Sequence, residues 1–142
     1  MHQVSQQELQ HLITVSTGFI DTYVIECDQQ PAMLLPQNIV LSALDSPTHM
    51  TSIQWHDSTL PVYAIHDPKQ AMGVALVIEG EESSQRFALM CNEMPQTMRL
   101  RISEVVDDEV ASDQPAIYQY VRVGEQRYHV PNLNYIEQSL TQ

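Results

Sequence analysis

The dominant pattern along the chain is an alternation of apolar and polar residues with a period of two. It is clearest at Met98, Leu100 and Ile102, which are separated by single polar residues. Because successive side chains of a strand point to opposite faces, this spacing predicts a half-buried strand. Residues 74–78 are all apolar, as expected for a strand that is covered on both faces. The patterning therefore predicts a protein made mainly of β-structure.

Further strands are predicted where apolar, β-branched and aromatic residues cluster between turn signals. These segments are residues 19–27, 32–35, 52–56, 60–65, 86–91, 117–123 and 126–130. Gly124 and Glu125 separate the last two and predict a two-residue hairpin turn. Pro61 lacks a backbone N–H, so we expect it at a sheet edge or at a bulge.

Three stretches have helical spacing instead. Residues 5–17 begin with a possible capping box, and residues 39–44 place apolar side chains at helical intervals. Residues 133–140 form an amphipathic pattern behind Asn132, a candidate cap. No linker rich in Gly, Pro or Ser divides the chain. We therefore expect a helical extension over residues 1–18 and one domain over residues 19–142.

The charge balance limits the classes of partner. The 142 residues include 18 acidic and six basic side chains, which gives a net charge of −12, and Lys69 is the only lysine. The hydrophobic fraction of 43% is that of a globular protein. A phosphate backbone repels so acidic a surface, because binding through counterion release needs a stripe of Lys and Arg. The composition therefore excludes nucleic acid as the main partner, and adsorption to anionic lipid with it.

The sequence also suggests a cellular location. The longest uninterrupted apolar run has five residues, whereas a spanning helix needs about 20. The first twenty residues contain no basic region followed by an apolar one, as a secretory signal would. Cys27 and Cys91 lie far apart in apolar contexts and are interpreted as buried, reduced thiols. We therefore expect a cytoplasmic protein without membrane insertion.

Motifs that would carry catalysis are missing from the sequence. It contains no HExxH, GxSxG, GxGxxG or Walker pattern. The dipeptides His56-Asp57 and His66-Asp67 are the best metal candidates, but adjacent strand positions point to opposite faces. A small metal-dependent β-barrel hydrolase and a barrel that binds a small ligand in an apolar cavity remain the alternatives. The sequence favours a binding or scaffold protein with no catalytic, metal or cofactor-binding residues.

Trp55 and the methionines allow two interpretations each. Trp55, the only tryptophan, would either pack in the core or anchor an interface. Met-rich surfaces can bind many partners. Met72, Met90 and Met98 lie in apolar strand contexts, so we expect them to fill gaps in the core instead.

Several segments, taken in order, resemble one known family. Leu35-Pro36 is followed by Val40, residues 53–62 form a strand pair around a turn, and Asn132 precedes the closing helix. Together with residues 88–92 and 118–136, these segments resemble the CheW-like domain of bacterial chemosensory systems, over residues 19–140. Trp55 in place of the commoner Leu is similar to the divergent adaptors attached to type IV pilus (twitching) chemosensory clusters.

The resemblance implies a fold, a function and a site. The fold would be all-β, with two side-by-side five-stranded SH3-like barrels that share a core and with short N- and C-terminal helices. The function would be that of a non-catalytic adaptor without a cofactor. Such an adaptor couples the cytoplasmic tip of a chemoreceptor to the regulatory domain of a histidine autokinase. The implied partner-binding residues are Val40, Ser42, Trp55 and His56.

The chain departs from the family pattern at two of these positions. His56 stands where the family has an Arg, and Ser42 stands where it has a Glu. A histidine cannot reproduce the bidentate contact that an arginine makes with a carboxylate. The resemblance therefore implies an accessory adaptor, whose contacts are weaker or directed at a different partner group.

Overall fold

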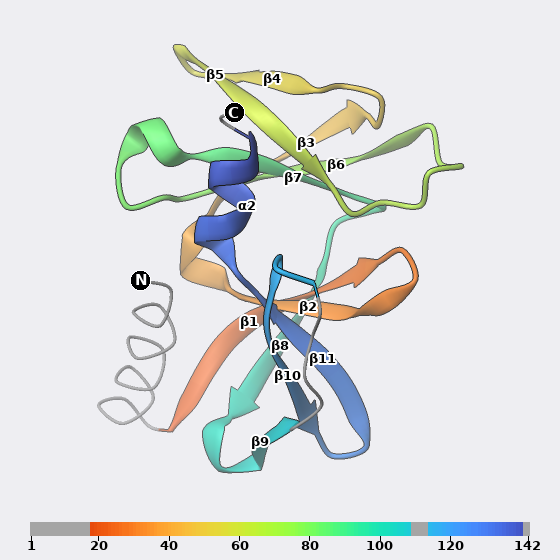
Figure 1. Ribbon diagram of the computed structural model, residues 1–142, viewed down its shortest axis with the longest axis vertical. Helices are drawn as coiled ribbons and strands as arrows, with labels where there is room; N and C mark the ends of the chain where they lie inside the picture. The colour runs from red at the N-terminus through yellow and green to blue at the C-terminus, as the bar shows by residue number, and fades with distance from the viewer. Residues whose placement is uncertain (1–17, 109–113, 141–142) are drawn as a thin grey trace.

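The computed structural model describes residues 18–108 and 114–140, which form eleven strands in two sheets and one α-helix, α2 (Leu133–Leu140) (Figure 1). The strands are β1 (Phe19–Cys27), β2 (Gln30–Pro36), β3 (Val40–Pro47), β4 (Ser52–Trp55), β5 (Ser58–Ala64), β6 (Met72–Ile78), β7 (Phe87–Cys91), β8 (Gln96–Arg101), β9 (Val105–Asp108), β10 (Ile117–Val123) and β11 (Gln126–Pro131). Three 3₁₀ turns, η1 (Gln37–Ile39), η2 (Ser83–Gln85) and η3 (Ile102–Glu104), lie between strands. The helix predicted at residues 5–17 lies outside the described residues.

The two sheets take their strands from different parts of the chain. The first sheet has the order β8-β1-β2-β11-β10-β9, so it combines strands from both ends of the chain. The second sheet has the order β3-β6-β7-β5-β4 and uses one continuous segment. In Figure 1 the second sheet lies above the first, and α2 lies beside the junction between them.

The first sheet must curl, because its two outermost strands are neighbours in sequence. β8 and β9 lie at opposite edges, yet only η3 separates them. Four residue steps reach at most about 14 Å. Five strand spacings across a flat sheet would require about 24 Å. In the second sheet, the outermost strands β3 and β4 are likewise joined by residues 48–51 alone.

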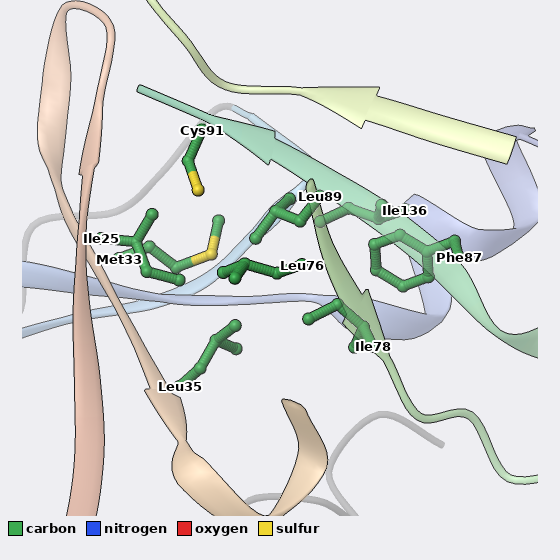
Figure 2. Close-up of a cluster of buried hydrophobic side chains, with 9 residues drawn as sticks. All are labelled: Ile25, Met33, Leu35, Leu76, Ile78, Phe87, Leu89, Cys91 and Ile136. Atoms are coloured by element: carbon green, nitrogen blue, oxygen red, sulfur yellow. The ribbon is translucent and has the colours of Figure 1, made fainter. Parts of the chain in front are cut away.

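Three groups of apolar side chains stabilise this arrangement. The first interior cluster lies within the first sheet and is centred on Leu34, Leu100 and Val121. The second interior cluster lies within the second sheet and contains Ile53, Leu60, Ala75, Val77, Ala88 and Met90. The shared cluster joins the sheets and α2, as Figure 2 shows, and contains Ile25, Met33, Leu35, Leu76, Ile78, Phe87, Leu89, Cys91 and Ile136.

The strands β6 and β7 belong to two of these clusters at once. In β6, Leu76 and Ile78 enter the shared cluster, whereas Ala75 and Val77 enter the second interior cluster. β7 alternates in the same way. This arrangement confirms that residues 74–78 are covered on both faces. On the interior face of the curled sheet, the small Ala75 and Ala88 leave room for Met90, while the larger side chains of the other face fill the gap between the sheets.

Several sequence predictions are confirmed in detail. The alternating segment at residues 98–101 belongs to β8, and its Leu100 is buried. Gly124 adopts a positive φ of 63° in the hairpin turn between β10 and β11, a conformation that glycine tolerates at little cost. Asn132 caps α2, since its Oδ1 accepts a hydrogen bond of 3.1 Å from the Tyr135 N–H. The mainly-β architecture with a short C-terminal helix therefore agrees with expectation.

Two predictions about the elements are wrong. Residues 39–44 do not form a helix, because Val40 begins β3, which pairs with β6 through an irregularity between Val40 and Ser42. That irregularity disturbs the period of two and imitates helical spacing. The first sheet also has six strands instead of five, because residues 105–108 form β9.

Pro61 occupies the position expected of a proline in a sheet. It pairs with Ser52 of β4 on one side, whereas the pairing of β5 with β7 begins one residue later, at Val62 and Ala88. Pro61 therefore stands where β5 leaves one neighbour and joins the other, so no regular ladder misses its N–H. The prediction for this residue is confirmed.

No helix in the described part of the chain has both the length and the apolar character that crossing a bilayer would require.

Candidate functional site

The four residues that the sequence assigns to partner binding all lie in the second sheet. Val40 and Ser42 belong to β3, Trp55 ends β4, and His56 begins the turn to β5. β3 and β4 form opposite edges of this sheet. Whether the four residues can act together therefore depends on how the sheet curls and on what lies between them.

Trp55 lies at the centre of a small group of side chains. It packs against the second interior cluster and is partly buried. The guanidinium carbon of Arg86 lies 5.4 Å from the centre of its ring, and the His56 ring contacts it edge-on at 4.3 Å. A guanidinium over an indole face is attracted by the ring quadrupole. His56 is exposed and adopts a positive φ of 53°, so the backbone turns sharply beside this group.

Arg86 connects this group to the end of β6. Its Nε donates a hydrogen bond of 2.7 Å to Oε1 of Glu79, and its Nη2 donates a longer one of 3.4 Å to Oε2. These hydrogen bonds are the main cause of the lowered pKa of the Glu79 carboxyl. The pair is partly exposed, so its net contribution to stability is small, but it fixes the direction of the guanidinium over Trp55.

The same end of the sheet contains the beginning of β3. Val40 pairs with Ile78, and the Glu79 N–H donates a hydrogen bond of 2.9 Å to the Ile39 carbonyl. Ser42 pairs with Val77, one step further into the sheet. We call the group of Val40, Ser42, Trp55, His56, Glu79 and Arg86 the Trp55 end. The structure thus places the four predicted residues at the same end of the strands, with Val40 packed on the shared cluster and Trp55 on the second interior cluster, and it adds Glu79 and Arg86, which the sequence patterns do not indicate.

The two roles considered for Trp55 are not exclusive. Its contact with the second interior cluster is core packing, and its partial exposure beside His56 leaves an accessible edge. Arg86 could not be found from the sequence, because it lies 31 positions from Trp55 and meets it only across the curled sheet.

The two His-Asp dipeptides lie far apart. His56-Asp57 precedes β5 and His66-Asp67 follows it, so seven residues of extended strand, about 23 Å, separate them. Among the described residues, no group of three or more His, Cys, Asp or Glu side chains is placed to hold a metal ion. The two dipeptides therefore cannot form the joint site that the hydrolase alternative requires.

The opposite end of the second sheet exposes methionine side chains. Met50, Met72 and Met94 are 38%, 56% and 50% exposed. They lie in or beside the loops at residues 48–51, 65–71 and 92–95, and we call this surface the methionine end. Met72 was expected in the core, and that prediction is wrong: it is the first residue of β6, pairs with Pro47 of β3 and lies beyond the last pair that β6 makes with β7, at Val74 and Cys91.

The other two methionines lie where the sequence predicts. Met90 is fully buried in the second interior cluster, and Met98 packs on the first interior cluster. The loop methionines Met50 and Met94 had no apolar neighbours in sequence, and only their convergence in three dimensions makes them a surface.

Hydrogen bonds tie the loops of the methionine end to one another. The Thr48 N–H donates to the Ala71 carbonyl at 3.0 Å, and the Asp67 N–H donates to Oδ1 of Asn92 at 2.7 Å. The Gln70 side chain donates to the carbonyls of Met72 and Asn92. The backbone of the three loops is thus held in place while the methionine side chains point outward.

The two thiols are unsuited to nucleophilic chemistry. Burial raises the pKa of Cys27 and that of Cys91 to about 12 in each case. The thiolate is the reactive form of cysteine, and a raised pKa removes it at neutral pH. Cys91 belongs to the shared cluster and is buried as expected, whereas Cys27 packs against the cluster and is only half-buried; both thiols are free.

Comparison of the chain with protein-family models and with curated proteins gives no match.

Proposed function

We propose that the protein is a CheW-like adaptor that couples a chemoreceptor to a histidine autokinase in the cytoplasm, as an accessory member of a type IV pilus chemosensory system. In this proposal the two curled sheets correspond to the two SH3-like barrels of that family. The protein acts by docking and performs no chemical step.

The arrangement of the strands is the observation that carries the proposal. The resemblance implies two barrels that share one core. The structure has two curled sheets, the first made from both ends of the chain and the second from its middle, with a shared cluster between them. The segments that carry the resemblance fall, in chain order, on β2, the start of β3, β4, β5, β7, β10, β11 and α2.

The Trp55 end supplies the candidate docking residues. Tryptophan and arginine are enriched at the energetic centres of protein interfaces. At this end both are present in one fixed group, with His56 exposed beside them. Arg86 provides a guanidinium next to the position where the family has its arginine and this chain has His56. Two of its five N–H donors are used by Glu79, which leaves three for a partner.

Binding measurements with purified partners test the proposal directly. The cytoplasmic tip of a chemoreceptor and the regulatory domain of a histidine autokinase, both from the same organism, are titrated against the full chain by calorimetry. We expect binding to at least the kinase domain, and increased receptor control of autophosphorylation when all three proteins are mixed. Absence of binding to both partners at about 100 μM would overturn the proposed function.

Two variants locate the contact. Trp55→Ala should weaken binding to the kinase domain by about tenfold, because it truncates an interface anchor. His56→Arg should strengthen binding to the receptor tip, because it restores a bidentate donor. His49→Arg makes the same charge change at the opposite end of the sheet and should leave both affinities unchanged. If all three variants bind like the original chain, the Trp55 end is not the contact surface.

A further inference from the structure

The methionine end has features of an interface. It contributes three of the six large apolar side chains that the described part of the chain exposes. Unbranched, polarisable methionine side chains adapt to the shape of a partner surface, and gathered apolar exposure of this kind marks interaction sites. Because the loop backbone is already hydrogen-bonded within the molecule, contact at this end would be made by side chains and not by addition of a strand.

The charges around the methionines are of both signs. Lys69, the only lysine of the chain, is exposed on the loop that leads to Met72. Glu93 is exposed immediately before Met94. Neither forms an ion pair with another described residue. The carboxylate of Asp67 is engaged locally, since its Oδ1 accepts a hydrogen bond from the Lys69 backbone N–H.

We propose that the methionine end binds a second copy of this chain in a two-fold symmetric dimer. In such a contact the same surface serves both partners, so that residue i of one copy meets residue j of the other and the reverse. Lys69 and Glu93, whose side chains form no ion pair within the described residues, allow such a surface to pair with itself, because each charge of one copy can meet the opposite charge of the other. Lys69 of each copy then lies opposite Glu93 of the other, while Met72 and Met94 of both copies form the apolar centre.

A purely basic partner would place a like charge opposite Lys69, and a purely acidic partner would place one opposite Glu93. Like charges across an interface repel, so neither kind of partner is favoured. The self-contact satisfies the two charges at once. It is independent of the proposed coupling function, which uses the other end of the sheet.

The dimer should be weak and should depend on salt. Three short loops offer less than the 20–30 residues that each partner of a standard interface contributes, so we expect dissociation near or above about 10 μM. Each copy has a net charge of −12, and this repulsion acts over about 30 Å at 0.01 M salt but only about 8 Å at 0.15 M. Dimerisation should therefore strengthen as salt rises over this range.

Sedimentation equilibrium of the full chain tests the proposal. Molar mass is followed from about 5 μM to 500 μM protein, at 0.01 M and 0.15 M salt. We expect a monomer–dimer equilibrium that shifts toward the dimer at the higher salt. Met72→Glu should raise the dissociation constant about tenfold or more, because it places a carboxylate in the apolar centre. Val106→Glu alters a residue of similar exposure, 51% against 56% for Met72, on the first sheet and should leave the equilibrium unchanged.

A charge exchange identifies the symmetric pairing. Lys69→Glu and Glu93→Lys, each alone, should weaken the dimer, because like charges then face each other. The double variant keeps the net charge of −12 and should restore dimerisation to within about twofold of the original chain. Melting temperatures confirm that each variant is folded, so that loss of the dimer is not loss of the fold.

Three outcomes would overturn the proposal. The first is a monomer at all concentrations and both salt conditions. The second is a dimer that persists in Met72→Glu or disappears in Val106→Glu. The third is a dimer that the single charge exchanges weaken and the double exchange fails to restore, which would exclude the pairing of Lys69 with Glu93. None of these outcomes contradicts the coupling function, and failure of kinase and receptor binding would leave the dimer intact.

Discussion

Two nitrogens of the Arg127 guanidinium contact one oxygen of Asp108, since both Nε and Nη2 lie 2.9 Å from Oδ2. Arg122 approaches the same oxygen at 3.7 Å from the neighbouring strand. Arg122 and Arg127 are directly paired across β10 and β11, so two guanidinium groups would face each other without the carboxylate between them. Asp108, which is almost fully buried at the end of β9, lies close to both guanidinium groups and offsets one of their two positive charges.

Asp108→Asn should therefore destabilise the first sheet. The amide keeps the shape of the side chain and removes its charge, which leaves two arginines opposite each other. Both arginines are almost half exposed, so water compensates part of the loss, and we expect a decrease of about 1–2 kcal/mol in the free energy of unfolding. Urea denaturation measures it. Asp107→Asn makes the same charge change at the exposed neighbouring residue and should cost less than about 0.5 kcal/mol. Equal losses for the two variants would contradict this account.

His129 should make folding sensitive to mild acid. The side chain is buried, and its Nδ1 lies 2.8 Å from the Pro31 carbonyl, which can only accept, so Nδ1 carries the hydrogen. Burial lowers the pKa of His129, and the hydrogen bond to Pro31 offsets part of this lowering. The unfolded chain, with a histidine pKa near 6.5, therefore takes up a proton at a pH where the folded chain does not. The free energy of unfolding should be constant above about pH 7 and should decrease from about pH 6.5 downward.

The measurement is a series of urea denaturation curves between pH 5 and pH 8. His129→Gln removes the titrating group and should flatten the dependence on pH in this range, even if the variant is less stable overall. His49→Gln, at an exposed position, should keep the original dependence. An unchanged slope in His129→Gln would show that a different group is responsible.

The thiols should be protected in the folded protein. With pKa values of about 12, roughly one thiol in ten thousand is ionised at pH 8. We expect Cys27 and Cys91 to resist iodoacetamide at pH 8 for hours and to react within minutes in urea. Mass spectrometry of the alkylated chain provides the measurement. Rapid modification of native Cys91 would show that the shared cluster opens frequently.

Trp55 should contribute to stability as well as to binding. Trp55→Ala removes a partly buried ring from the second interior cluster and should lower the free energy of unfolding by about 2 kcal/mol, less than for a fully buried tryptophan. Trp55→Phe keeps an aromatic ring in the cluster and should lose about half as much. Thermal melting of both variants, compared with their affinities for the kinase domain, separates packing from docking. A melting temperature that is unchanged in Trp55→Ala would show that the ring does not support the core.

The sequence predicts those strands whose neighbours in space impose a simple pattern. The sequence predicts β6 because both faces of this strand are covered, so that every residue from 74 to 78 is apolar. The sequence predicts β8 because only one face of this strand is covered, which makes apolar and polar residues alternate. β3 was missed because it lies at an edge and contains an irregularity, so neither pattern applies over its length. β9 was missed because Asp108 is buried by arginines from β10 and β11, which are distant in sequence.

The candidate site shows the same division. The strand pair around Trp55 was predicted from local sequence, but with a turn at residues 57–59, whereas the structure has a two-residue turn between Trp55 and Ser58. The contact of Arg86 with Glu79 follows from the pairing of β6 with β7, whereas the contact of Arg86 with Trp55 joins residues that only the tertiary fold brings together. The exposure of Met72 depends on where the adjacent strands end. Local patterns thus locate the elements, while long-range packing decides which side chains meet.

The different origins of the two sheets impose an order on folding during synthesis. All strands of the second sheet lie between Val40 and Cys91, so this sheet can form while the last third of the chain is still on the ribosome. β1 and β2 are made first but must wait for β8 to β11 before their own sheet can close. During that interval the apolar side chains of β1 and β2, among them Ile25 and Leu35, can already cover β6 and β7. A nascent chain arrested after β7 should therefore contain a protease-resistant second sheet and exposed, cleavable β1 and β2 backbones.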